Sequence, residues 1–175
     1  MKIYSSFSAA QKQPCLIKLE NNLYILSFQV MKLLPALNMI NQAIKSGLVT
    51  PETVVVETSS GFFAYGVGVA CSELGLKFKI VSDLQMDPLV QRQLVNQGGD
   101  VSIVTEPEEV GGIQQARLSR LYEVIESEKK SFWTCQYDNQ DNSLAYLELG
   151  EELAETLEQD VILVGPVGLE VPLVA

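Results

Sequence analysis

Short apolar segments typical of buried strands alternate along this chain with segments typical of helices. The clearest example is the β-branched run at residues 53–56, which is followed by a polar turn and then by small and apolar residues at 62–74. β-Branched runs of this length are typical of parallel strands that are buried on both faces. Regular alternation of strand and helix predicts an α/β fold of three layers, αβα, with a mostly parallel twisted sheet.

The same patterns assign the remaining elements. Further strands are predicted at 15–20, 77–82, 100–104, 131–136 and, as a last buried strand, 161–164. Further helices are predicted from about 32–34 to 46, from 87–88 to 97, from 113 to about 128 and from 142 to about 159. Gly47 and Gly75 stand where helices stop, and Asp87-Pro88 has the residue types of a helix start. No linker or internal repeat interrupts the chain, so we expect a single domain over residues 1–175.

The composition excludes several classes of function. The chain has no histidine, which removes Ser-His-Asp and Cys-His catalysis and most catalytic zinc sites. A net charge of −10 disfavours binding to nucleic acids and to anionic membranes, because both repel an acidic surface. The three cysteines lie far apart without a C-x-x-C pair, so we expect free thiols and no metal site. No apolar run approaches the roughly 20 residues of a membrane span and the start lacks a signal peptide, so the expected location is the cytoplasm.

Three loops follow the carboxyl ends of predicted strands, where open α/β sheets bind ligands: residues 57–61, 105–112 and 165–168. The first reads Glu-Thr-Ser-Ser-Gly and resembles the E-x-T-S-G-N signature of the cysteine synthase family, pyridoxal-phosphate (PLP) enzymes of fold type II. In that family the loop binds the substrate carboxylate with hydroxyls and with backbone amides at a helix start. The resemblance therefore implies that Ser59, Ser60 and Gly61 bind substrate.

Further motifs extend the resemblance, in the family's order, over residues 15–168. The Lys-Ser-Gly turn at 45–47 lies 13 residues after Lys32, and segment 32–40 is similar to the K-D-R-P-A-x-x-x-I pattern that carries the PLP lysine. Segment 106–113 is similar to the 2,3-diaminopropionate synthases of siderophore pathways. The Q-Y/F-x-N-x-x-N motif, whose glutamine contacts the carboxylate, appears with Gln136 as its first residue. The resemblance implies the fold of the family's N-terminal domain and makes Lys32 the candidate catalytic residue.

Several positions depart from the family where it contacts its cofactor. Phe62 replaces the asparagine that hydrogen-bonds the PLP ring hydroxyl, and bulky residues at 24–28 replace a glycine-rich segment. Of the phosphate-binding loop, Gly165 and Gly168 remain, without hydroxyls and next to Pro166. The family's second half has no counterpart in these 175 residues. We therefore expect a degenerate, truncated relative that holds no cofactor.

Each candidate residue also has a purely structural interpretation. Lys32 suits the surface at a helix start, Ser59 and Ser60 suit a helix N-cap, and Gln136 suits the end of a strand. Phe62 and the following Phe63 are expected to fill the core.

Three hypotheses for function follow. The favoured one is a non-catalytic homologue that binds a protein or a small anion. The second is a PLP enzyme that replaces or eliminates a group at Cβ of a serine-derived amino acid, as in the synthesis of cysteine or 2,3-diaminopropionate, with Lys32 holding PLP and removing the α-proton. The third is a stable remnant without a ligand.

Strongly apolar segments at 23–34 and 163–174 bear on assembly. Large exposed apolar patches usually mark interfaces. We therefore expect a homodimer, or a complex with another protein, through this surface. The alternative is that residues 167–175 fold back and cover it within one chain.

Overall fold

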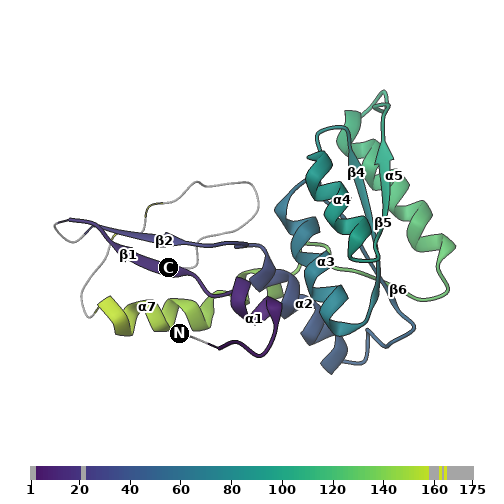
Figure 1. Cartoon of the computed structure of the whole chain (residues 1–175). Coiled ribbons are helices and arrows are strands. Elements are labelled where there is room, and N and C mark those ends of the chain that lie inside the picture. The colour runs from purple at the N-terminus through teal and green to yellow at the C-terminus, as the bar shows by residue number, and fades with distance from the viewer. Residues whose placement is uncertain (1–2, 21–22, 158–161, 163, 165–175) are drawn as a thin grey trace.

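A computed structural model of the protein describes residues 3–20, 23–157, 162 and 164. At its centre lies a parallel sheet of four strands in the order β5-β4-β3-β6 (Figure 1). Its strands are β3 (Val54–Thr58), β4 (Lys77–Asp83), β5 (Asp100–Val104) and β6 (Ser131–Trp133). The register pairs Val56 with Lys79 on one side and with Trp133 on the other. The predicted parallel sheet is confirmed.

Helices cover both faces of this sheet. Alternate side chains of the fully buried strand β3 point to opposite sides: Val54 and Val56 pack against α5 (Gly112–Ser127), whereas Val55 faces the other layer. That layer contains α3 (Phe62–Leu74) and α4 (Pro88–Asn96). The predicted three-layer αβα architecture is therefore confirmed.

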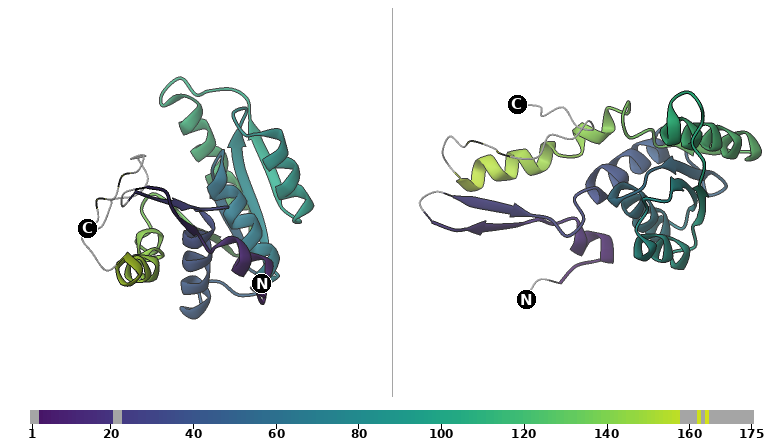
Figure 2. Two further views of the ribbon diagram at one scale, coloured as in Figure 1. Left: turned by 60° about the vertical axis from the view of Figure 1, so that its left-hand side comes forward. Right: turned by 90° about the horizontal axis from the view of Figure 1, so that it is seen from above.

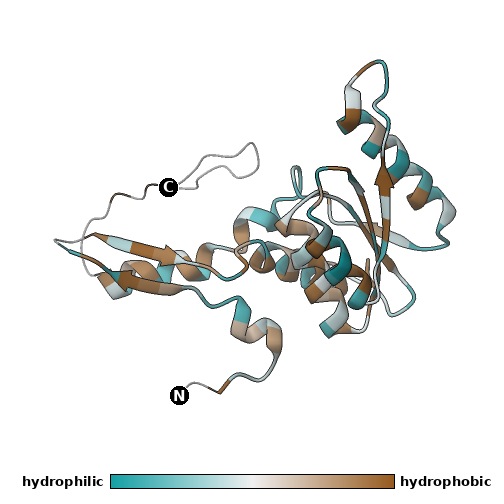
Figure 3. Cartoon of the chain, turned by 45° about the horizontal axis from the view of Figure 1, so that its top comes forward, coloured by the Kyte–Doolittle hydropathy of each residue, from teal (hydrophilic) through white to brown (hydrophobic). Residues whose placement is uncertain are grey.

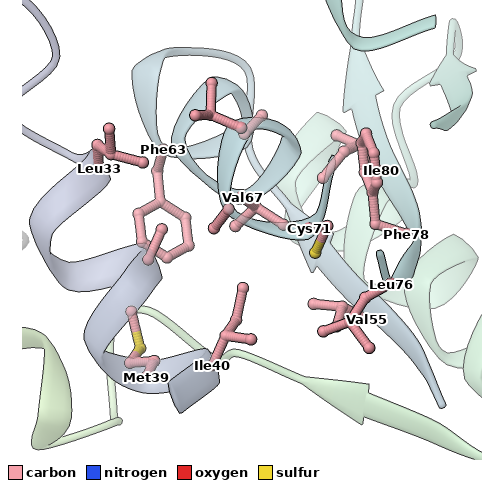
Figure 4. Packing of buried hydrophobic residues seen from close by; sticks show 14 of the residues in the cluster. Leu33, Met39, Ile40, Val55, Phe63, Val67, Cys71, Leu76, Phe78 and Ile80 are labelled. Atoms are coloured by element: carbon pink, nitrogen blue, oxygen red, sulfur yellow. The ribbon is translucent and has the colours of Figure 1, made fainter. Parts of the chain in front are cut away.

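The largest apolar core lies between α3 and α2 (Leu33–Lys45) and continues to the sheet (Figure 4). Met39 and Ile40 of α2 are fully buried, as is Val67 of α3. The helices approach closely because residue 66 of α3 is glycine: a Cβ there would lie 2.7 Å from the Lys32 carbonyl oxygen. This contact fixes the start of α2 against α3.

Local signals in the sequence identify the helix ends correctly. The Asp87 side chain accepts a hydrogen bond from the Leu89 amide, as expected of an N-cap before a proline at the first helical position. Gly75 ends α3 with φ of 67°, and Gly47 follows α2 with φ of 76°. Both glycines adopt the left-handed conformation that closes a helix.

A two-stranded hairpin projects from this body. Its strands β1 (Cys15–Lys18) and β2 (Tyr24–Ser27) are antiparallel and pair Ile17 with Ile25, outside the central sheet. Strand β1 was expected, but β2 was not, because its alternation is short and lies within a longer apolar stretch. The last helix, α7 (Leu147–Leu157), projects on the same side as the hairpin (Figures 1 and 2). A short helix, α1 (Phe7–Gln11), precedes the hairpin.

The structure corrects the C-terminal elements that the sequence predicted. The helix expected over 142–159 is two helices, α6 (Asp141–Leu144) and α7. The strand expected over 131–136 ends at Trp133, because Cys135 adopts φ of 50°, which is incompatible with a strand. The strand expected over 161–164 falls largely outside the described residues, and the two of its members that are described, Ile162 and Val164, are exposed and not in a strand. Among the helices that the structure describes, none has the length and apolar character needed to cross a membrane.

Candidate functional site

A hollow of about 460 Å³ lies at the carboxyl edge of β3. Its walls come from residues 28–32 before α2, the turn at 59–63, Arg117 of α5 and the pair 136–137 after β6. Parallel sheets gather their ligand-binding loops at this edge. Lys32, Ser59, Ser60, Gly61 and Gln136, which the sequence motifs singled out from three distant segments, therefore meet at one site.

Lys32 occupies the N-cap position of α2 and is partly buried. It makes no side-chain capping bond there. Lys32 is one of the residues that line the hollow. The close packing of Gly66 on the Lys32 backbone sets where this side chain starts.

The turn between β3 and α3 forms a second wall. The Ser59 amide donates to the carbonyl of Val81 over 3.2 Å, which extends the sheet by one residue. The Ser59 hydroxyl accepts from the Gly61 amide over 3.3 Å. The first amides of α3 have no carbonyl partner inside their own helix, and their partial positive charge favours an anion.

Gln136 lies in the loop after β6 and is almost fully buried. Its Nε2 donates to the Thr58 carbonyl over 3.4 Å, and its own carbonyl accepts from Asn142 Nδ2 over 2.6 Å. Asn139 Nδ2 donates to the Thr134 carbonyl over 3.1 Å. Both asparagines of the Q-x-x-N-x-x-N motif thus hold the loop that carries Gln136.

A buried carboxylate lies directly behind the site. Glu57, at the end of β3, is 1 % exposed and accepts hydrogen bonds from the Thr58 amide, the Trp133 indole, the Thr134 hydroxyl and the Gln136 amide. Burial raises the pKa of Glu57, and the four donors oppose that rise. The sequence motif contains Glu57, but its spacing gives no indication that three of the four partners lie 76 to 79 residues further along the chain.

Arg117 is the second cationic residue that lines the hollow. Its Nη1 lies 3.0 Å from Asp83 Oδ2 in a largely buried ion pair, and its Nε has no hydrogen-bond partner among the described residues. The hydroxyl of Thr58, also buried at the end of β3, likewise lacks a described partner. In folded proteins, buried polar atoms are normally bonded, and ordered water often supplies the bond. Sequence analysis missed Arg117, which lies in a helix without a motif of its own.

The two phenylalanines after the turn differ. Phe63 is 2 % exposed and packs in the core as expected. Phe62, also expected in the core, is 68 % exposed and borders the hollow. The reason is geometric: Phe63 points towards Leu33 and Met39 of α2 (Figure 4), whereas Phe62, one residue earlier on α3, lies outside this packing. The candidate phosphate-loop residues Gly165 and Gly168 lie outside the described residues.

A smaller hollow of about 310 Å³ lies between α5 and the strands β4 and β5. Its charged side chains are paired with one another or with close neighbours: Lys79 with Asp100 and Glu128, and Arg120 with Glu123. Within the described part of the chain, no three cysteine or acidic side chains gather as a metal site would need. The hollow around Lys32 is therefore the stronger candidate site.

Comparison with known proteins gives one family and one fold. The sequence model described as "Pyridoxal-phosphate dependent enzyme" matches residues 4–169. A hydrogen sulfide-producing enzyme from Fusobacterium nucleatum is 26 % identical, with a TM-score of 0.77 over 90 % of this chain and 54 % of that one. An O-acetylserine dependent cystathionine beta-synthase from Helicobacter pylori is 21 % identical, with a TM-score of 0.76 over 90 % and 55 % of the two chains. An O-acetylserine sulfhydrylase from Entamoeba histolytica is 22 % identical, with a TM-score of 0.75 over 90 % and 51 %. The chain spans about half the length of these solved structures.

Proposed function

The chain belongs to the pyridoxal-phosphate dependent enzyme family, and on this premise we propose that it binds a small carboxylate, such as an amino acid, at the turn 59–61 without cofactor chemistry. The observation that carries the proposal is the composition of the hollow. Lys32 and Arg117 are its charged lining residues, and no carboxylate is among the described residues that line it. In a chain with a net charge of −10, a lining with cationic but no acidic side chains among the described residues supports the binding of an anion, with the charge of Arg117 partly offset by its ion pair with Asp83.

The turn supplies the second half of the argument. A carboxylate in front of α3 would accept hydrogen bonds from the first amides of the helix, which have no carbonyl partner inside it, next to the hydroxyl of Ser60. The amide of Gln136 adds a neutral polar group on the opposite wall. Charge-assisted hydrogen bonds of this kind are the strong ones in ligand sites.

The described residues fit PLP only in part. Lys32 and the turn suit a lysine adduct and a substrate carboxylate, but the exposed ring of Phe62 offers no hydrogen bond to the ring hydroxyl at the position where the family has asparagine.

The alternative function is that of a PLP enzyme acting at Cβ of a serine-derived amino acid. The presence of Lys32 in the same hollow as the carboxylate turn favours it. PLP, when bound, stabilises negative charge at the substrate α-carbon. Lys32 would hold the cofactor and move the α-proton, and Ser59, Ser60 and Gly61 would orient the carboxylate.

Calorimetric titration tests the main proposal. We expect L-serine to bind and L-serinamide, which lacks the carboxylate, to bind at least about tenfold more weakly, the loss of one charge-assisted hydrogen bond. Lys32→Met should weaken serine binding, whereas Lys45→Met, which removes the same charge at the exposed far end of α2, should not. Equal affinity for serine and serinamide, or no binding of either, would contradict the proposal.

Spectroscopy separates the two functions. Protein mixed with PLP, reduced with borohydride and digested should show no PLP-modified Lys32 by mass spectrometry. A visible absorption band together with modified Lys32 would favour the enzyme.

The hairpin favours a further role in protein binding. One face of β1–β2 carries four aliphatic side chains that are 45 % to 59 % exposed: Ile17, Leu19, Leu23 and Ile25. Figure 3 shows both strands of the hairpin as largely apolar. A second copy of the chain is the proposed partner, because symmetric pairs dominate among oligomers and this face is self-complementary in composition.

Light scattering over a range of concentrations tests the pairing. We expect a dimer that dissociates when Ile17 and Ile25 are both replaced by serine, and no change for Leu89→Ser, a more exposed leucine on α4. A monomer at every concentration, without binding of a hydrophobic dye, would rule the pairing out.

A further inference from the structure

Glu57 is a buried carboxylate without a counter-ion among the described residues. A buried charge normally needs a cation, or several hydrogen bonds, to offset its desolvation. Here four donors perform that task, and three of them come from the segment 133–136. Burial of a carboxylate carries a large desolvation cost, which points to a role for Glu57 beyond packing.

Each carboxylate oxygen accepts two of the four hydrogen bonds. Oε1 accepts from the Thr58 amide over 2.7 Å and from the indole of Trp133 over 3.4 Å. Oε2 accepts from the Thr134 hydroxyl and, over 3.3 Å, from the Gln136 amide. Only a carboxylate accepts at both oxygens, because an amide side chain has a donor in one of these positions.

These contacts lie beyond the end of the strand pairing. The ladder between β3 and β6 ends at Val56 and Trp133, and the last backbone bond joins the Thr134 amide to the Val56 carbonyl over 3.3 Å. Past that point the chain turns at Cys135, with its positive φ, and no longer follows β3. The side chains of Glu57 and Gln136 then connect the two segments.

We infer that Glu57 is a positioning residue that sets the distance between the two walls of the anion site, the turn 59–61 and Gln136. This inference rests on the proposed function for its purpose and deepens it by naming the residue that holds the site together. Glu57 is not among the residues that line the hollow, so it acts through the segments that it joins.

The informative variant is Glu57→Gln, which keeps shape and size. Whichever way the amide is turned, its NH2 group faces a backbone N–H, of Thr58 or of Gln136, and one connection is lost. A matched control is Val124→Ala in α5, which removes buried apolar atoms away from the hollow and lowers stability without touching either wall. This control shows whether an effect of Glu57→Gln comes from lower stability alone or from displacement of the two walls.

Hydrogen exchange of the backbone amides tests the inference directly. We expect Glu57→Gln to speed exchange by about tenfold or more at whichever of the Thr58 and Gln136 amides faces the new NH2 group, since a lost bond to a charged acceptor is worth about that factor. Val124→Ala should not speed exchange at Thr58 or Gln136 beyond the increase that its lower global stability explains. Unchanged exchange at both Thr58 and Gln136 in Glu57→Gln would overturn the inference, whether or not a ligand binds.

A double-mutant cycle adds the readout for ligand binding, with L-serine as the probe. Glu57→Gln should weaken binding by about tenfold in the wild type but less than about twofold in a Gln136→Ala background, because its effect passes through Gln136. Equal effects in both backgrounds would contradict positioning through Gln136. Failure of the wild type to bind serine would reject the proposed function, while the exchange experiment would still decide the role of Glu57.

Discussion

Two regions of the molecule contain similar apolar residues that differ in burial. One is the body around the sheet, and the other is the projection formed by the β1–β2 hairpin and α7. In the body, Ile40 and Val55 are fully buried. In the projection, Ile25 is 46 % exposed, and α7 has no buried residue at all. Packing inside the chain therefore accounts for the apolar residues of the body, whereas the exposed apolar residues of the hairpin support the proposed pairing.

The polar groups differ in the same way. Behind the site, Glu57, Gln136 and Asn142 are buried and joined by hydrogen bonds, so their geometry is fixed by many contacts. The acidic residues of α7, such as Glu148 and Glu151, are exposed. A ligand site needs buried, hydrogen-bonded groups of this kind, because only groups with a fixed geometry are in place before the ligand binds.

The largest expected effect contrasts one isoleucine in each region. Ile40→Ala should lower the free energy of unfolding by about 2–5 kcal/mol, because it leaves a cavity between α2 and α3. Ile25→Ala should lower it by less than about 0.5 kcal/mol when measured at monomer concentrations, since the side chain is half-exposed. Urea unfolding followed by circular dichroism gives both values. Equal losses would mean that the hairpin is part of the folded core.

A pair of glycines sharpens the contrast. Gly66→Ala places a methyl group 2.7 Å from the Lys32 carbonyl oxygen, so we expect a loss of about 1–3 kcal/mol and weaker serine binding as the start of α2 moves. Gly150 lies inside α7 with nothing near its Cβ position, so Gly150→Ala should increase helicity and stabilise by up to about 1 kcal/mol. Thermal unfolding of both variants provides the measurement. A tolerated Gly66→Ala would show that α2 and α3 are not held as closely as described.

The sequence predicts the sheet and the gathering of the motifs well, because both depend on local pattern and on the rule that parallel strands end at one edge. The burial of 53–56 and the cap at Asp87 are encoded in neighbouring residues. The hairpin strand β2 was missed because four residues of alternation are too few to distinguish from an apolar run. The contacts of Glu57 and the place of Arg117 depend on segments far apart in the chain, and no spacing within either segment reveals them.

The smallest expected effect concerns the response of the body to pH. Burial raises the pKa of Glu57, so the folded protein binds this proton more readily than the unfolded chain does. The proton therefore stabilises the fold fully below the unfolded pKa of about 4.3, and this stabilisation is lost as the pH rises through the folded pKa. The slope for a single proton is at most about 1.4 kcal/mol per pH unit.

Glu57→Gln isolates this contribution, because every other titrating group, including Glu73, whose pKa is lowered by the Ser8 hydroxyl, cancels in the comparison. The free energy of unfolding of the wild type minus that of Glu57→Gln should fall as the pH is raised from 4 towards neutrality. The acidic projection offers a matched control. Glu151→Gln removes an exposed carboxylate from α7, so its difference from the wild type should change little with pH. A difference for Glu57 that rises with pH would mean that the four hydrogen-bond donors outweigh burial, and that the carboxylate behind the site is held in its charged form.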